Sequence, residues 1–393
     1  MVPCNNMHVS PRCYSLNSPP SLDDFKRLLR QTTDKSTYPL AAEIQNNVPI
    51  YNCASCRLDD SQTEALQNEW HHILLRGPGV FVLKRFFTQK QIIDVTNEAF
   101  NAIMAHERET NGNAGDHFAA TSTNARIWNS FSKHCLQDPM SFVTYYSNPL
   151  FRTVCEAWLG PGFRLTAQVN IVKPGGEAQV SHRDYHIGFQ TERDAAQWPK
   201  AIQIASQFLT LQGAVAHTDM PLDSGPTRLL PFSQMFEEGY MAYRREEFAQ
   251  YFLDHYVALP LEKGDAIFFN PALFHAAGEN TTESFERKAN LIQASSAFGK
   301  TMETIATIPL VERTWNILVE RYAKHGMNDE VDAFVRAVAD GYPFPTNLDR
   351  RPPAPGGMAP ESEQDLLRRG LNGKWSRERI VSELIDLQEK SKA

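Results

Sequence analysis

Three residues of this sequence have the types and the spacing of ligands for a transition metal. His182 and Asp184 are separated by Arg183, and His275 follows later at the end of an apolar run. Two imidazoles and one carboxylate can bind one face of an octahedral Fe(II) ion and leave the opposite face open. The set predicts the iron site of a non-haem oxygenase, with these residues as metal ligands and catalytic residues.

The flanking residues predict how the three side chains meet. Side chains at positions i and i+2 of a strand point to the same side, with Cα atoms about 6–7 Å apart, so His182 and Asp184 could reach one ion. The run over residues 266–274 is typical of a buried strand, and His275 follows it directly.

A fourth residue, Arg287, has the chemistry needed by a second ligand of the iron. Iron bound on one face keeps positions for a chelating 2-oxo acid and for O₂. The distant carboxylate of 2-oxoglutarate needs a fixed cation, and a guanidinium binds a carboxylate through two hydrogen bonds. Arg287 stands at the start of a predicted strand over residues 289–295. We expect Fe(II), 2-oxoglutarate and O₂, with 2-oxoglutarate anchored by Arg287.

Other interpretations of these residues stay open. His182 and His186 would share one face if this segment were helical, as zinc ligands can, although the flanking residues lack a helical pattern. Cys53 and Cys56 form a CxxC pair that could also bind zinc. His and Asp at this spacing can also be ordinary hydrogen-bonded side chains.

Four residues are candidates for substrate contact. Tyr185 and His186 follow Asp184, Arg126 follows a polar segment, and Phe344 lies in a Pro-rich segment near the C-terminus. Each also has a structural interpretation, as a packed aromatic ring, a surface arginine or a core hydrogen bond.

Composition limits the class of protein. The chain has 393 residues, of which 42% are hydrophobic and 22% charged, as in globular proteins. The net charge of −7 argues against a nucleic-acid partner. No apolar run has the ~18 residues of a membrane span, and the polar N-terminus has no signal core. Six cysteines are too few for a disulfide framework, so we expect a cytoplasmic protein. The last helix could pack on the core or on a second subunit, which leaves a homodimer open.

The apolar pattern divides the chain into an N-terminal extension over residues 1–60, a β-rich domain over 61–300 and a helical C-terminal extension over 301–393. Ser21 is a plausible N-cap of a single helix in the first part, and Ser376 of the last helix in the third. Expected strands span residues 80–84, 164–172, 201–216, 228–230, 256–261, 266–269 and 289–295. These patterns predict an α+β fold with a mainly β core, a double-stranded β-helix (a cupin-like jelly roll), between helical extensions.

These motifs together resemble the phytanoyl-CoA dioxygenase family of Fe(II)- and 2-oxoglutarate-dependent oxygenases, over about residues 75–298. The order and spacing of the motifs carry the resemblance more than any one of them. The matching segments are Lys173-Pro174-Gly175, Gln179-Val180-Ser181-His182-Arg183-Asp184, residues 225–233, Gly264-Asp265, His275 and Arg287-Lys288-Ala289.

The resemblance implies iron on His182, Asp184 and His275, and 2-oxoglutarate on Arg287. Gln179 matches a position that contacts the cofactor in some members. Two departures are visible. The gap from His275 to Arg287 is one residue longer than expected, and residues 231–234 lack the usual Gly and His.

The implied reaction is oxidation of an unactivated C–H bond of a small molecule, by hydroxylation, desaturation or oxidative cyclisation. The sequence shows no clear basic cluster for the phosphates of coenzyme A, which favours natural-product or amino-acid-derived metabolism. Three alternatives remain: an acyl-CoA hydroxylase, a cupin-like metal dioxygenase that needs no 2-oxo acid, and a metal-binding jelly roll without catalysis.

Overall fold

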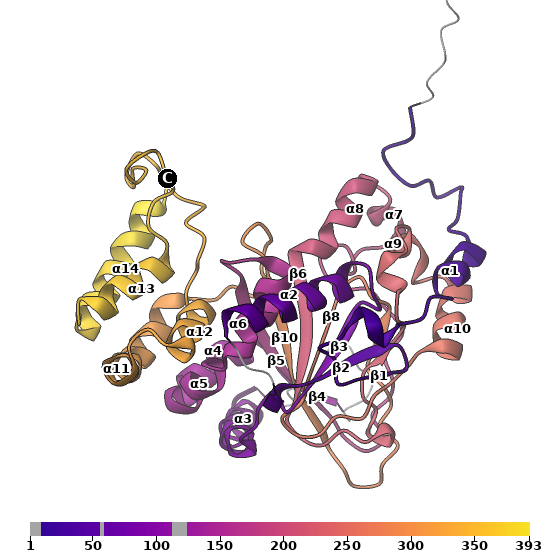
Figure 1. The fold of residues 1–393 in the computed structure, drawn as a ribbon, viewed down its shortest axis with the longest axis horizontal. Coiled ribbons are helices and arrows are strands. Elements are labelled where there is room, and N and C mark those ends of the chain that lie inside the picture. The colour runs from indigo at the N-terminus through magenta and orange to yellow at the C-terminus, as the bar shows by residue number, and fades with distance from the viewer. Residues whose placement is uncertain (1–8, 56–58, 112–123) are drawn as a thin grey trace, which may run out of the picture.

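The structure is a computed structural model and describes residues 9–55, 59–111 and 124–393. A mixed sheet of eight strands forms its centre, in the order β1-β2-β3-β8-β6-β10-β5-β4 (Figure 1). These strands are β1 (Glu43–Gln45), β2 (Val48–Asn52), β3 (Val80–Lys84), β4 (Asn124–Ile127), β5 (Arg164–Val172), β6 (Thr210–Ala216), β8 (Ala266–Phe269) and β10 (Arg287–Ser295). A second, two-stranded sheet pairs β7 (Arg228–Leu229) with β9 (His275–Ala276).

Strand alternation gives the large sheet two different faces. Leu211 and Val215 of β6 point into the larger core, under the helices. Ala214, between them, points the other way and packs in a second core with Leu229 of β7 and Leu273, just before β9. We call the side that carries Gln212 and Ala214 the site face, because it faces the small sheet.

Five helices pack on or beside the opposite face, and three of them begin at a capping side chain. The side chains of Asp59, Asp138 and Asn148 accept backbone N–H groups as N-caps, and the last two precede a proline in the first turn. These helices are α2 (Asp60–Leu75), α3 (Lys90–Asn111), α4 (Ser130–Gln137), α5 (Pro139–Tyr146) and α6 (Pro149–Leu159).

A group of shorter helices surrounds the small sheet. Phe25 of α1 is fully buried against the rings of Phe236, Phe248 and Phe274, so the N-terminal helix packs directly behind the residue that precedes His275. This group contains α1 (Leu22–Leu28), α7 (Glu192–Ala195), α8 (Lys200–Ser206), α9 (Gly239–Ala242) and α10 (Glu246–His255). Short 3-10 turns are η1 (Lys35–Thr37), η2 (Cys53–Ser55), η3 (Gln207–Leu209), η4 (Leu222–Ser224) and η5 (Ser233–Met235).

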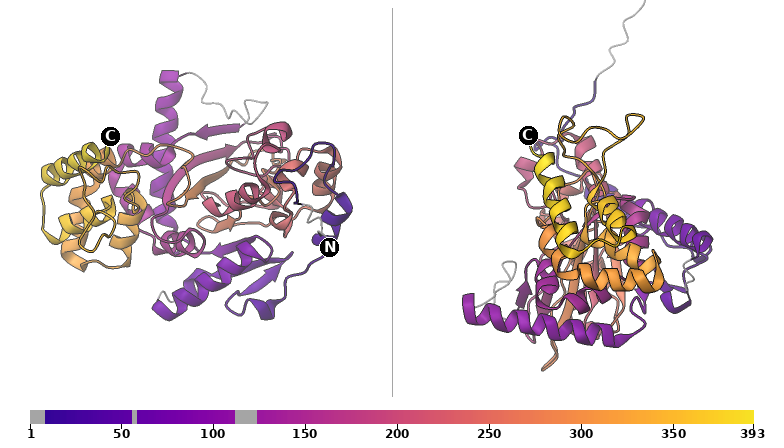
Figure 2. Two further views of the ribbon diagram at one scale, coloured as in Figure 1. Left: turned by 90° about the horizontal axis from the view of Figure 1, so that it is seen from above. Right: turned by 90° about the vertical axis from the view of Figure 1, so that its left-hand side faces the viewer.

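The C-terminal helices gather at the end of the molecule opposite α1 (Figures 1 and 2). They are α11 (Thr307–His325), α12 (Asp329–Val338), α13 (Glu363–Asn372) and α14 (Arg377–Ser391). Trp315, Phe334 and Leu367 join the same core as the sheet, so this part is packed onto the β domain. No helix among the described residues is both long and apolar enough to cross a membrane.

The structure confirms the α+β class, the jelly-roll core and the N-caps Ser21 and Ser376. Three expectations about elements outside the triad are wrong. Residues 201–216 are not one strand, because Gln203 bonds to the carbonyls of Ala195 and Trp198 and holds α8 before β6 begins. Residues 256–261 form single bridges at Val257 and Leu261 in place of a strand.

The third correction concerns the N-terminal extension. Residues 1–60 hold β1 and β2 in addition to one helix, and β2 pairs in parallel with β3. Residues 43–52 therefore extend the large sheet at its edge. The division of the chain at residues 60 and 300 stays a prediction.

Candidate metal centre

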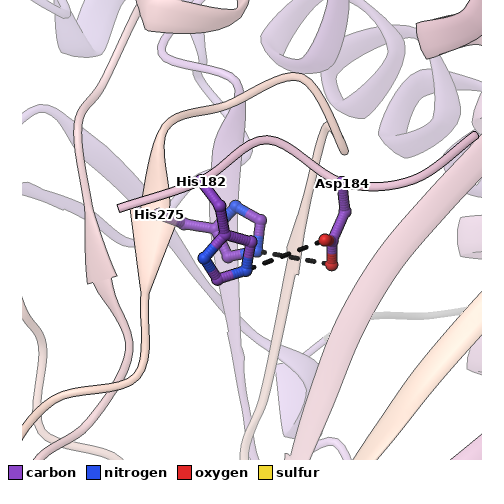
Figure 3. Close-up of side chains that lie close together, drawn as sticks. All are labelled: His182, Asp184 and His275. Carbon is purple, nitrogen blue, oxygen red and sulfur yellow. Dashed lines mark ion pairs between the residues drawn. The ribbon is translucent and has the colours of Figure 1, made fainter. Parts of the chain in front are cut away.

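His182, Asp184 and His275 converge between the two sheets (Figure 3). Their potential ligand atoms all lie within 4.8 Å of one another. Nε2 of His182 is 3.7 Å from Asp184 Oδ1, and Nε2 of His275 is 3.7 Å from Asp184 Oδ2. The carboxylate faces the two imidazoles, so an ion placed between them would be within reach of all three side chains.

Backbone hydrogen bonds hold this geometry. The N–H of His182 donates to the carbonyl of His275 at 2.9 Å, and the reverse bond is 3.1 Å. The N–H of Asp184 donates to the carbonyl of Pro271 at 3.0 Å. The expected regular strand around His182 is wrong, since this pair is an isolated bridge. The bridge nonetheless sets both histidines side by side.

Both imidazoles are oriented by their Nδ1 atoms. Nδ1 of His182 lies 2.9 Å from the carbonyl of Val180, and Nδ1 of His275 lies 2.9 Å from the carbonyl of Leu273. Because a carbonyl only accepts, each Nδ1 must carry the proton and each Nε2 keeps its lone pair. Histidines that bind metals in proteins are oriented in this way.

Charge at the centre also suits a cation. Burial raises the pKa of Asp184, but His182, His275 and the hydrogen bond from Gln212 outweigh burial and hold this pKa well below its usual value. Burial, together with the nearby His275, lowers the pKa of His182. An ionised carboxylate beside an imidazole with a lowered pKa is suited to binding a divalent metal.

Arg183, between His182 and Asp184, points away from the triad and fixes the segment. Its guanidinium is buried and donates to the carbonyls of Ser233 at 2.7 Å and Phe236 at 2.8 Å. A Cβ atom on Gly239 would lie 1.8 Å from Arg183 Cζ, so only glycine lets α9 begin here. The buried side chain thus anchors the loop that carries His182 and Asp184.

Arg287 is a buried cation whose hydrogen-bond partners among the described residues are neutral oxygens. Its side chain donates to the carbonyl of Gly225 and, at 2.9 Å, to Asn170 Oδ1, while its Nε has no hydrogen-bond partner. Burial, and to a smaller extent the nearby charge of Arg126, lowers the pKa of Arg287 to about 10. No ion pair of Arg287 is found among the described residues, so a carboxylate would supply what this site lacks.

Comparison with known proteins assigns the family. The chain matches the family model of phytanoyl-CoA dioxygenase (PhyH) over residues 51–289, more than half of its length. The chain belongs to the phytanoyl-CoA dioxygenase family. This is a family of Fe(II)- and 2-oxoglutarate-dependent oxygenases, and the protein is accordingly a non-haem iron dioxygenase that uses 2-oxoglutarate and O₂.

Two proteins of similar sequence are named as dioxygenases. Dioxygenase andF of Emericella variicolor is 23% identical over 225 residues, which cover 54% of this chain and 69% of the relative. Dioxygenase trt7 of Aspergillus terreus is 27% identical over 227 residues, covering 54% of this chain and 68% of the relative.

Solved structures include more distant enzymes. The α-ketoglutarate-dependent carbocyclase SnoK from nogalamycin biosynthesis is 20% identical with a TM-score of 0.44, covering 60% of this chain and 86% of that one. The epimerase SnoN from the same biosynthesis is 16% identical with a TM-score of 0.40, covering 60% and 84%.

Of the other predicted site residues, Gln179 and Arg126 lie close to the strands that border the site. Gln179 lies beside the strand of His275, and its side-chain oxygen accepts the N–H of Ala277 at 3.2 Å. Arg126 donates to Gln168 Oε1 at 2.8 Å, on the site face near Arg287.

Residues after Asp184 turn toward neighbouring loops. The Tyr185 hydroxyl donates to the carbonyl of Lys300 at 3.2 Å, and His186 Nε2 lies 3.1 Å from Thr210 Oγ1. Residues 182–186 are not helical, which removes the basis of the zinc interpretation for His186. Phe344 is 39% exposed, and its ring packs on Tyr342. Cys53 is buried, whereas Cys56 lies outside the described residues.

The residues that contact the triad were not predicted from the sequence. Gln212 contacts Asp184, and Gln168 lies on the same face of the sheet. A faint signal exists, because polar residues at alternate positions of β5 and β6 break otherwise apolar strands. Which of these polar side chains meets the triad depends on strand register.

Proposed function

We propose that His182, Asp184 and His275 bind Fe(II), that Arg287 anchors 2-oxoglutarate, and that the protein oxidises an unactivated C–H bond of a small molecule. The observation that carries this proposal is the orientation of the triad. Both Nδ1 atoms are committed to carbonyls, so two Nε2 lone pairs and one carboxylate face a common point.

The residues of the chain divide the work. When bound, iron with 2-oxoglutarate and O₂ supplies the oxidising chemistry. Asp184 contributes negative charge, and the histidines contribute neutral donors. Arg287, with the charge of Arg126 nearby, provides the positive potential that a distant carboxylate needs.

The substrate part of the proposal is a small molecule of natural-product or amino-acid-derived metabolism, which undergoes hydroxylation, desaturation or oxidative cyclisation. The net charge of −7 supports this choice over an acyl-CoA, whose phosphates would meet an acidic protein. Residues 1–60 and 301–393 serve in this proposal as extensions of one catalytic domain.

Anaerobic titration with Fe(II) and then 2-oxoglutarate tests the proposal. We expect the visible charge-transfer band of the iron chelate, its loss in His275→Ala, and weaker 2-oxoglutarate binding with normal iron binding in Arg287→Ala. Iron binding without the band would favour a dioxygenase that needs no 2-oxo acid. Failure to bind iron would overturn the assignment of the triad.

A further inference from the structure

The segment between β10 and α11, residues 296–306, borders the site on the side of β4 and β5. The carbonyl of Lys300 in this segment accepts a hydrogen bond from the hydroxyl of Tyr185, the residue that follows Asp184. Further along, Gln168 Nε2 lies 3.3 Å from Met302 Sδ, and the N–H of Asn129 donates to Glu303 Oε1 at 2.7 Å. One short segment thus connects the metal-ligand loop with the site face of β5.

Glu303 is the unusual residue of this segment. Its Oε1 accepts from Asn129 and, at 3.5 Å, from Gln168, whereas its Oε2 is buried and has no hydrogen-bond partner. No ion pair of Glu303 is found in the described part of the chain, and burial raises its pKa. A buried carboxylate oxygen without a hydrogen-bond donor costs free energy, so a bound ligand that donates to Oε2 would supply the missing hydrogen bond.

The position of Glu303 fits a substrate site. Its neighbour Gln168 lies on the site face of β5, and β10 separates β5 from β6, where Gln212 contacts Asp184. Two strand spacings place these backbones about 10 Å apart, which is the scale of a small organic molecule. Between them, Gln293 of β10 also has a buried Oε1 without a hydrogen-bond partner.

We propose that Glu303 Oε2 accepts a hydrogen bond from a hydroxyl group of the substrate and thereby orients the substrate against the metal centre. This inference rests on the proposed function and adds the substrate class, a neutral molecule that bears an alcohol or phenol.

Charge balance selects the hydroxyl over an ammonium group. Arg126 and Arg287 are two buried cations on this face, and less than a tenth of each residue is exposed to solvent. In the proposed function the distant carboxylate of 2-oxoglutarate offsets the charge of Arg287. Lys133 and, more weakly, Arg126 act electrostatically on Glu303, so its single negative charge already faces two cations. A cationic substrate would add an unbalanced charge, whereas a hydroxyl donates without one.

The test uses the full chain loaded with Mn(II) and 2-oxoglutarate and three probes of one ring size. Cyclohexanol donates and accepts, cyclohexylammonium only donates, and cyclohexanone only accepts. Mn(II)-dependent relaxation of the probe protons reports both affinity and closeness to the metal. Glu312→Ala, at an exposed position of α11, is the matched control.

We expect wild type to prefer cyclohexanol, with about tenfold weaker binding in Glu303→Ala, as for a lost hydrogen bond to a charged group. Glu303→Gln should retain cyclohexanol within about threefold and gain cyclohexanone, because an amide can donate where the carboxylate could not. Glu303→Gln also decides the question if Glu303→Ala does not fold.

Three outcomes would overturn the inference. The first is that wild type and Glu303→Ala bind cyclohexanol equally well. The second is that wild type prefers cyclohexylammonium and that Glu303→Gln loses this preference. The third is that the loaded protein relaxes the protons of none of the probes. Loading with Mn(II) and 2-oxoglutarate is measured first. A failure at that step counts against the proposed function and is therefore distinct from a failure of the role of Glu303.

Discussion

Gln212 Nε2 donates a hydrogen bond of 2.5 Å to Asp184 Oδ2. This bond ties the middle of the large sheet to the loop that carries two of the three proposed ligands. The amide cannot turn over without placing its oxygen against the carboxylate, so the contact fixes the orientation of both groups. Gln212 is therefore a positioning residue for the metal centre.

Replacement of Gln212 by alanine should weaken metal binding about 10–100-fold, as when other partners of metal ligands are removed. Calorimetric titration with Fe(II) under anaerobic conditions measures the change. Gln250→Ala is the matched control, because Gln250 bonds to Asp254 on the exposed side of α10. Equal affinities in Gln212→Ala and wild type would show that Asp184 needs no such partner.

Arg287→Lys should lower the affinity for 2-oxoglutarate at least about tenfold and leave metal affinity unchanged. The planar guanidinium donates to Gly225 and Asn170 and still has an N–H group left for a carboxylate. The ammonium group of lysine cannot reproduce this geometry. Lys288→Ala is the control, because Lys288 bonds to Asn101 on the other side of the strand. Loss of 2-oxoglutarate binding in the control alone would move the anchor to Lys288.

Arg183→Met should lower the free energy of unfolding by about 2–4 kcal/mol, because it leaves buried carbonyls without donors. The lost interactions include those with the carbonyls of Ser233 and Phe236 and the contact of the guanidinium with the Tyr240 ring. Urea denaturation measures the difference. Arg193→Met, at an exposed position, should stay within about 0.5 kcal/mol of wild type.

His134 makes stability depend on pH. Burial lowers the pKa of His134 from 6.5 to about 3. Between these values the unfolded chain binds a proton that the folded chain excludes, so stability is full above pH 6.5 and falls as the pH decreases. The contribution is up to about 1.4 kcal/mol per pH unit.

Urea denaturation of His134→Gln between pH 7 and pH 5 tests this assignment. The variant keeps a polar group beside Ser141 but cannot titrate, so its stability should depend less on pH than that of wild type. His255→Gln, at an exposed position, is the control. An unchanged pH dependence in His134→Gln would assign the effect to other groups.

Local sequence determined much of this protein. Apolar runs bounded by turns gave β3, β5 and β8 with the bounds that were predicted, and capping side chains began α1 and α14 as expected. The types and order of His182, Asp184, His275 and Arg287 also identified the enzyme class, because metal and carboxylate chemistry restrict which residues can serve.

Tertiary structure decided what depends on partners far away in the chain. Residues 201–206 have a pattern compatible with a strand, but they form a helix that the side-chain hydrogen bonds of Gln203 tie to Ala195 and Trp198. The parallel pairing of β2 with β3 is a long-range contact without a local signal. The register of β5, β10 and β6 places Gln212 at Asp184, one of the proposed metal ligands, and Gln168 beside Glu303. A shift by one residue would turn both side chains to the opposite face.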